Sequence, residues 1–248
     1  MAESLASIYG RLMRPRNTQA DLSDLVECAT CGGRSWVILR QDKHPLDGQW
    51  IRCPGCTTTE EISERLHVPM ERMSSTFKNF DTATTAPVVT AAASIMRQWS
   101  DTLSPPWVVL CGPVGSGKSY LMYAAALKLL QRGYSAPVHT SARIIGHIQR
   151  AINSDTWPNM DEVIVSYAQQ TWPLIIDEWG LKESSAAMAW WERILGHRYE
   201  AALPTAICTN ALPEDIERLS LRMRSRMEDK HISRLLVMHG AEDYRKRK

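Results

Sequence analysis

From residue 107 onward, short and wholly apolar runs alternate with longer segments of helical periodicity. Such runs predict strands buried on both faces of a parallel sheet, and they lie at 107–112 (WVVLCG), 174–176, 205–208 and 235–238, with a further short strand expected at 137–140. The helical stretches fall at 118–132, about 141–152, 160–171, 185–202 and 213–219. This alternation predicts an α/β fold, a parallel sheet with helices on both faces.

The chain before this region divides into an N-terminal part, residues 1–72, and a polar linker, residues 73–86. The N-terminal part ends in a predicted helix at 60–73, and the linker contains both phenylalanines of the chain, Phe77 and Phe80. Apolar residues then recur at spacings of three and four from Val88 to Trp99, which predicts an amphipathic helix at the start of the third part, residues 87–248.

Four of the six cysteines form two CxxC pairs, and these are Cys28, Cys31, Cys53 and Cys56. Two such pairs supply four thiolates to one tetrahedral Zn²⁺. Apolar stretches at 36–39 and 50–51 flank a turn at Asp47-Gly48 and predict two short paired strands. The sequence therefore predicts a zinc ribbon whose metal is structural, since four thiolates leave no open position. The other two, Cys111 and Cys208, are expected to be small buried hydrophobes.

Composition and the pattern of the first residues argue against a membrane protein and against a secreted protein. Among 248 residues, 44% are hydrophobic and 23% are charged, as in ordinary globular domains. No apolar run approaches the roughly 18–20 residues of a transmembrane helix, and the first residues lack the pattern of a signal peptide. A cytoplasmic protein without membrane contact is expected. The net charge is only +2, but the chain finishes in a basic cluster at 245–248, which suits either nucleic acid or solvent.

The segment after the first apolar run matches the phosphate-binding pattern GxxxxGK[ST] in full. It consists of Gly112, Pro113, Val114, Gly115, Ser116, Gly117, Lys118 and Ser119, followed by Tyr120. Its glycines let the backbone wrap around phosphates, and the amide groups at the start of the next helix bind the anion. Lys118 is expected to reach the β- and γ-phosphates, and Ser119 to place its hydroxyl on Mg²⁺. The sequence predicts a protein that binds ATP with Mg²⁺.

Two further strand ends carry polar residues suited to hydrolysis. The run at 174–176 leads into Asp177, a candidate Mg²⁺ ligand, and Glu178, a candidate base for the attacking water. Asn210 follows another strand and is expected to contact the γ-phosphate and the water. A solvated turn would explain each pattern alone, but beside a phosphate loop hydrolysis is favoured.

An arginine-rich segment, LRMRSRMED at 221–229, follows the last predicted helix. An arginine that stabilises the developing charge on a phosphoryl group adds on the order of 10³–10⁵ in rate. A neighbouring subunit is a possible source of such an arginine. The alternative is a surface that forms salt bridges or faces DNA.

Together, GPVGSGKS, LIIDEWG, CTN and the arginine-rich segment resemble an AAA+ ATPase. With FKNFD before the core and RYEAALPTAICTN, the chain is similar to helicase loaders of the DnaC/DnaI type and to IstB-type transposition ATPases over roughly residues 75–245. The resemblance implies a P-loop NTPase core with a five-stranded parallel sheet in the order 5-1-4-3-2. It also implies ATP-dependent self-association, binding of single-stranded DNA, and an N-terminal module that holds the hexameric replicative helicase.

By position in this resemblance, Arg226 is the arginine finger and Arg222 supports it. The short stretch after the last predicted strand leaves no room for a helical lid domain, as in loaders of this group. An additional helix within 141–170 is expected to contact DNA, with Arg143, His147 and Arg150 on one face; a solvated face explains the same spacing.

Three functions compete at this point. The first is an ATP-dependent helicase loader in DNA replication, favoured by the zinc ribbon. The second is an IstB-like transposition helper that acts on duplex DNA and a transposase. The third is a zinc-ribbon adaptor for nucleic acid that binds ATP without hydrolysing it, and Glu178 argues against it.

Overall fold

A computed structural model of the chain describes residues 36–38, 48–53, 58–82, 85–153, 158–180, 183–240 and 243–244. Its centre is a parallel sheet in the order β4-β5-β6-β3-β7. The strands are β3 (Trp107–Cys111), β4 (Val138–Thr140), β5 (Leu174–Asp177), β6 (Thr205–Thr209) and β7 (Ser233–Val237). Counted from β3 as the first strand, this is the order 5-1-4-3-2 read from the opposite edge, so the predicted AAA+ topology is confirmed.

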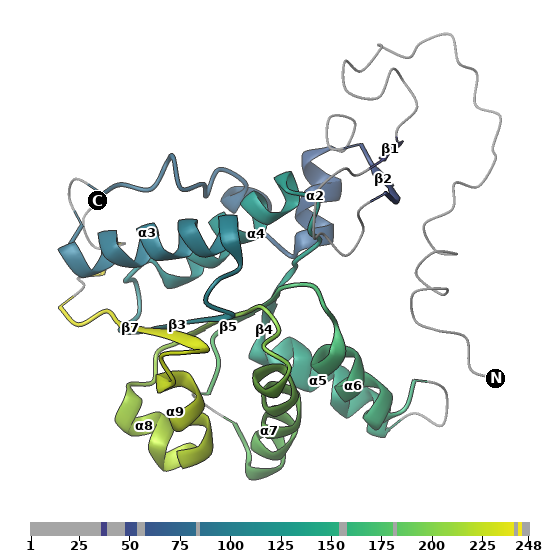
Figure 1. Ribbon diagram of the computed structural model, residues 1–248, viewed down its shortest axis with the longest axis vertical. Helices are drawn as coiled ribbons and strands as arrows, with labels where there is room; N and C mark the ends of the chain where they lie inside the picture. The colour runs from purple at the N-terminus through teal and green to yellow at the C-terminus, as the bar shows by residue number, and fades with distance from the viewer. Residues whose placement is uncertain are drawn as a thin grey trace, which may run out of the picture.

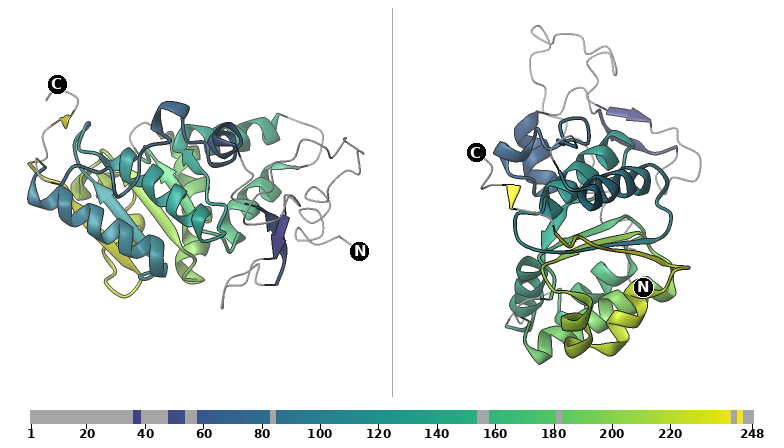
Figure 2. Two further views of the ribbon diagram at one scale, coloured as in Figure 1. Left: turned by 90° about the horizontal axis from the view of Figure 1, so that it is seen from above. Right: turned by 90° about the vertical axis from the view of Figure 1, so that its left-hand side faces the viewer.

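Helices cover both faces of the sheet and make a three-layer structure (Figure 1). One face carries α3 (Pro87–Thr102) and α4 (Lys118–Gln131), and the other carries α5 (Ser141–Ile152), α6 (Met160–Gln169), α7 (Ser185–Glu200), α8 (Pro213–Leu219) and α9 (Leu221–Glu228). Alternate residues of β3 serve the two cores. Val108 and Leu110 pack in the core beneath α3 and α4, whereas Trp107 and Val109 pack beneath α5–α9. Figure 2 shows the sheet edge-on between the two layers.

Most predicted helices are confirmed, with ends that shift by about two residues. Two elements in the C-terminal part of the chain differ from prediction. The last strand begins at Ser233 rather than at 235, and the arginine-rich segment itself forms α9. Ser220 begins α9 because its side chain accepts a hydrogen bond from the Met223 amide, which satisfies an otherwise unpaired donor. No helix among the described residues is long and apolar enough to cross a membrane.

The predicted continuous helix at 60–73 is wrong. A capping box between Thr58 and Glu61 starts α2 (Thr59–Leu66), but His67 takes a left-handed conformation and ends it. Pro69 follows, and a residue before proline avoids the helical region, so only a short 3₁₀ helix, η2 (Met70–Arg72), comes next. Leu66 and Val68 are buried in the same core as α3 and α4. This segment is therefore packed onto the core of the α/β domain.

Near the N-terminus, β1 (Trp36–Ile38) pairs with β2 (Trp50–Arg52) in antiparallel register. Gly48, in the predicted turn, has φ 77°, a value that glycine adopts without strain. The predicted strand pair is confirmed. Of the four candidate zinc ligands, Cys53 is buried, and Cys28, Cys31 and Cys56 lie outside the described residues. The zinc site stays a prediction.

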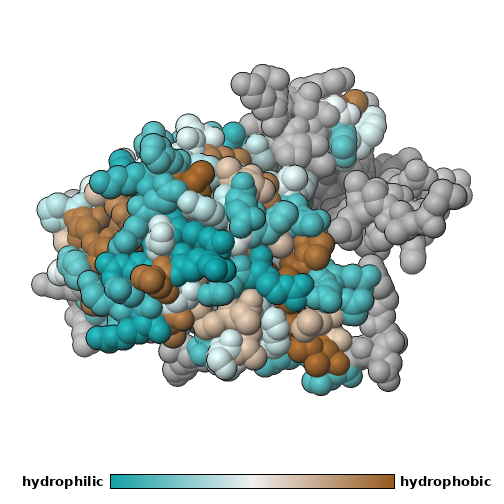
Figure 3. Space-filling view, turned by 60° about the horizontal axis from the view of Figure 1, so that its bottom comes forward, coloured by the Kyte–Doolittle hydropathy of each residue, from teal (hydrophilic) through white to brown (hydrophobic). Residues whose placement is uncertain are grey.

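The outer side of the α5–α9 layer is mostly hydrophilic, with separate hydrophobic patches (Figure 3). Exposed apolar side chains at the junction of α8 and α9 include Leu219, 38% exposed, and Leu221, 67% exposed. Arg222 lies beside them and is exposed as well. This junction combines apolar surface with positive charge.

Candidate nucleotide-binding site

The phosphate-binding loop joins β3, in the interior of the sheet, to the start of α4. Gly115 has φ 78° and Gly117 has φ 93°, and these conformations turn the chain sharply into the helix. The first amide groups of α4 have no acceptor within the helix and carry its positive dipole end. The loop is therefore built to hold an anion.

Lys118 is only 6% exposed, and its ammonium group is held by the loop itself. Its Nζ donates to the carbonyl oxygens of Gly112 at 2.8 Å and Pro113 at 2.7 Å, and to Ser116 Oγ at 3.3 Å. Burial lowers the pKa of Lys118, against the smaller opposing effect of neighbours that include the Asp177 carboxylate. A partly desolvated cation of this kind gains more from a phosphate group than an exposed one does.

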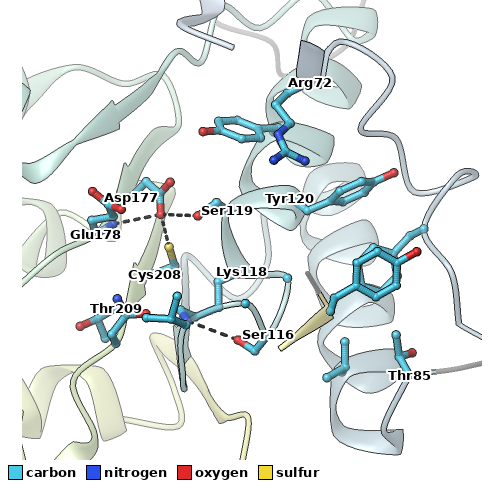
Figure 4. A pocket seen from close by; sticks show the side chains of 18 of the residues that line it. Arg72, Thr85, Ser116, Lys118, Ser119, Tyr120, Asp177, Glu178, Cys208 and Thr209 are labelled. Atoms are coloured by element: carbon cyan, nitrogen blue, oxygen red, sulfur yellow. Dashed lines mark hydrogen bonds between the residues drawn. The ribbon is translucent and has the colours of Figure 1, made fainter. Parts of the chain in front are cut away.

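Asp177 ends β5 and is 3% exposed. Its Oδ1 accepts hydrogen bonds from Ser119 Oγ at 3.1 Å and from the Glu178 amide at 3.0 Å, and it also contacts the Cys208 thiol (Figure 4). Burial raises the pKa of Cys208 well above its usual value, so the thiol keeps its proton and can donate it. The structure thus brings Ser119 and Asp177 together across 58 residues. A hydroxyl and a carboxylate are hard oxygen ligands that fit Mg²⁺.

Glu178 is exposed and lines the cavity in front of the loop, together with Thr209 and Asn210. Its φ of 58° is uncommon for a residue other than glycine and turns the chain directly after the strand. Thr209 is fully buried and accepts a hydrogen bond from the Ala211 amide at 2.9 Å, so the chain turns tightly after β6 as well. Two strand ends therefore present a carboxylate and an amide to one cavity.

The cavity has a volume of about 380 Å³. Val114 to Tyr120 line it, whereas Gly112 and Pro113 take part through their carbonyl groups. The linker supplies one wall, because Phe80 lines the cavity and its ring lies 5.2 Å from that of Tyr120. Phe77 instead packs against the core beneath α3 and α4.

Sequence reasoning missed several residues of the cavity, among them Arg72, Tyr123, Thr140, Cys208 and Tyr244. For one of these residues, Cys208, the sequence contains a pattern that could have indicated its place. Cys208 lies two residues before Asn210, and the alternation of a strand puts such residues on the same side. Arg72 and Tyr244 approach from distant parts of the sequence, and no local pattern indicates them.

The two predicted finger arginines lie outside this cavity, on α9. The Arg226 side chain is only 14% exposed, with its NH2 atom 3.5 Å from a Glu200 oxygen and its guanidinium 5.4 Å from the centre of the Tyr199 ring. Arg222 is exposed. Neither arginine reaches the nucleotide site of its own chain.

Comparison with known proteins adds a family. Residues 61–217 match the family of the IstB-like ATP binding protein. No curated protein sequence matches the chain. Several solved structures share its fold, at identities too low to show more than that.

The DnaC helicase loader superposes with a TM-score of 0.57 at 15% identity, over 67% of this chain and 98% of that one. DnaI superposes with a TM-score of 0.54 at 18% identity, over 71% of this chain and 93% of that one. DnaA bound to AMPPCP and single-stranded DNA superposes with a TM-score of 0.55 at 19% identity, over 65% of this chain and 49% of that one. This chain thus spans about half the length of the replication initiators that it resembles, with 49% of each covered.

Proposed function

The chain belongs to the IstB-like ATP-binding protein family, and from this premise we propose that it is an AAA+ ATPase that loads the replicative DNA helicase onto single-stranded DNA. One observation carries the ATPase part of the proposal. Lys118, Ser119, Asp177, Glu178 and Asn210 come from three strand ends and meet at one cavity. This set combines a phosphate cation, magnesium-binding oxygens, a base and a polar contact for the terminal phosphate.

Each residue has a separate task in hydrolysis. The loop amides and Lys118 bind the phosphates, and Ser119 with Asp177 would hold Mg²⁺, which neutralises charge on the β- and γ-phosphates. Glu178 orients the attacking water and accepts its proton. Asn210 donates a hydrogen bond to the γ-phosphate and so keeps it in line with the water.

The loader part of the proposal rests on structural neighbours and on surface charge. The DnaC helicase loader and DnaI share the fold over 67% and 71% of this chain. On α5, Arg143 and Arg150 are exposed and lie on the side of the helix that faces away from the core. Two exposed arginines on one helix suit contact with a nucleic-acid backbone.

The test of this function is assembly with the helicase. We expect the protein, mixed with the replicative helicase of its host and ATP, to give a discrete complex of a helicase hexamer with several copies of this chain in native mass spectrometry. Removing zinc with a chelator should abolish the complex, since structural zinc supplies folding energy to small modules. A protein that hydrolyses ATP but forms no helicase complex would contradict the loader proposal.

A transposition helper is the second candidate, favoured by the family match itself. Such a protein would form ATP-dependent filaments on duplex DNA. Electron microscopy of the protein with ATP and a long duplex distinguishes the two, because a loader is expected to prefer single strands. Filaments on duplex DNA without a helicase complex would favour the helper.

We further propose that the active assembly is an oligomer in which Arg226 of one copy serves the nucleotide site of the next. Arg226 lies outside its own cavity, and Leu221 on the same helix is exposed, which suits a helix that another copy covers. An Arg226→Ala protein should lose on the order of 10³-fold in ATP hydrolysis. Mixing it with a Lys118→Ala protein should restore part of the rate. At some interfaces the Lys118→Ala copy then supplies its intact Arg226 to the intact nucleotide site of the Arg226→Ala copy.

The control for this mixing experiment is Arg193→Ala, which removes an exposed arginine of α7 that pairs with Asp161. It should hydrolyse ATP at the natural rate. No recovery in mixtures whose mixed assembly is confirmed by mass would contradict the role of Arg226.

A further inference from the structure

Arg72 lies on η2, in the segment that joins the N-terminal part of the chain to the ATPase core, and it lines the nucleotide cavity. Its guanidinium extends toward the region of Ser119 and Tyr120 (Figure 4). The side chain is exposed, and it makes no hydrogen bond or ion pair with any residue that the structure describes. An arginine without a partner, aimed into a phosphate site, is a candidate ligand of the phosphates.

The catalytic end of the cavity lies within reach of this charge. Burial raises the pKa of the Tyr123 phenol, the carboxylates of Asp177 and Glu178 raise it further, and Arg72 lowers it. One phenol thus lies in the field of both the arginine and the catalytic carboxylates. Arg72, Asp177 and Glu178 therefore act on the same part of the cavity, which all three residues line.

A second cation besides Lys118 would help to balance the negative charge of a bound nucleotide in this cavity. Among the described residues that line it, the cationic ones are Lys118 and Arg72, and the acidic ones are Asp81, Asp177 and Glu178. A nucleoside triphosphate with one Mg²⁺ still carries a net negative charge, and the diphosphate carries less. Arg72 would therefore favour the triphosphate through direct attraction.

The backbone holds Arg72 in place from both sides. Val68 is 1% exposed and Ser75 is 2% exposed, so the chain is buried before and after η2. The Tyr120 hydroxyl, which belongs to the start of α4, donates to the Thr76 carbonyl at 3.1 Å. A contact between the guanidinium and a phosphate would therefore restrain η2. This helix follows α2, which in turn follows the predicted helicase-binding part of the chain.

We propose that Arg72 binds the terminal phosphate of ATP within its own chain, so that the segment before the ATPase core reports whether triphosphate or diphosphate is bound. This inference rests on the proposed ATPase function and adds to it a discriminating residue that comes from outside the strand ends and the phosphate loop.

Binding of ATP and ADP to an Arg72→Gln protein tests the proposal, by isothermal titration with Mg²⁺ at low salt. ATP affinity should fall by about fivefold, as expected for one partly exposed ionic contact, while ADP affinity changes by less than about twofold. The loss should shrink at 0.5 M salt, because screening weakens an exposed ionic contact. Arg72→Lys should recover part of the affinity. The matched control is Arg97→Gln, an exposed arginine of α3 outside the cavity, which should change neither affinity.

Hydrogen exchange gives a readout that a purely structural role would not change. In the natural protein, amides of residues 68–76 should exchange more slowly with ATP than with ADP, and in Arg72→Gln this difference should disappear. An Arg72→Gln protein with the natural ratio of ATP to ADP affinity and the natural exchange pattern would overturn the role of Arg72 alone. A natural protein that binds no ATP would instead overturn the proposed ATPase function, and this inference with it.

Discussion

A Glu178→Gln protein is expected to bind ATP as the natural chain does and to hydrolyse it at least about a hundredfold more slowly, since a positioned base contributes roughly 10²–10⁴ in rate. Glutamine keeps the size and the hydrogen-bonding capacity of the side chain but cannot accept the proton of the attacking water. Glu178 is exposed in the cavity directly after β5. Its replacement should therefore cost little stability.

The rate of hydrolysis is measured as phosphate release at saturating ATP, and the affinity is measured by equilibrium binding of a fluorescent ATP analogue. Both measurements use conditions in which the natural protein hydrolyses ATP. Glu60→Gln removes an exposed carboxylate on α2 and serves as the matched control, with no expected change in either quantity. Hydrolysis by Glu178→Gln at the natural rate would show that another group activates the water.

The second large effect concerns Arg198, which is fully buried on α7 without a carboxylate partner among the described residues. Its guanidinium donates to the Thr205 hydroxyl and to the carbonyl oxygens of Tyr167, Gln170, Trp172 and Pro204, at distances from 2.6 to 3.2 Å. Burial lowers the pKa of Arg198 to about 9, so it is still charged at neutral pH. One side chain thus donates hydrogen bonds to carbonyl groups at the end of α6 and just before β5 and β6.

An Arg198→Met protein should lose about 3–5 kcal/mol of unfolding free energy, because methionine fills the space but leaves buried carbonyl groups without donors. Urea unfolding followed by circular dichroism measures the loss. Arg193→Met, five residues earlier on the same helix, removes an exposed ion pair and should cost less than about 1 kcal/mol. Equal stability of the two variants would mean that water satisfies the carbonyl groups.

The phosphate site could be predicted from the sequence because its determinants are contiguous. The loop from Gly112 to Ser119 follows an apolar strand and opens a helix, and Asp177 directly ends another strand. Alternation of apolar runs and helices gave the fold class by itself. The order of the strands required the family resemblance, since pairing between distant strands leaves no local trace.

What could not be predicted depended on tertiary approach or on weak local rules. The helix expected at 60–73 breaks because of Pro69, a signal that was present in the sequence. Met223 and Met227, four residues apart and both buried, were a signal for α9 that charge alternation obscured. Arg198 is unpredictable in a different way, because an arginine is assigned to the surface by default.

The strand that carries the phosphate loop has both of its neighbours far ahead in the sequence. β3 pairs with β6 through Trp107 and Thr205, and with β7 through Trp107 and Ser233. On a ribosome that adds about 5–20 residues per second, roughly a hundred residues must follow β3 before its first partner exists, a delay on the order of 5–20 s. During that time the apolar strand WVVLC has no sheet to join. Nascent chains should therefore depend on a holding chaperone and acquire nucleotide affinity only after β7 has been made.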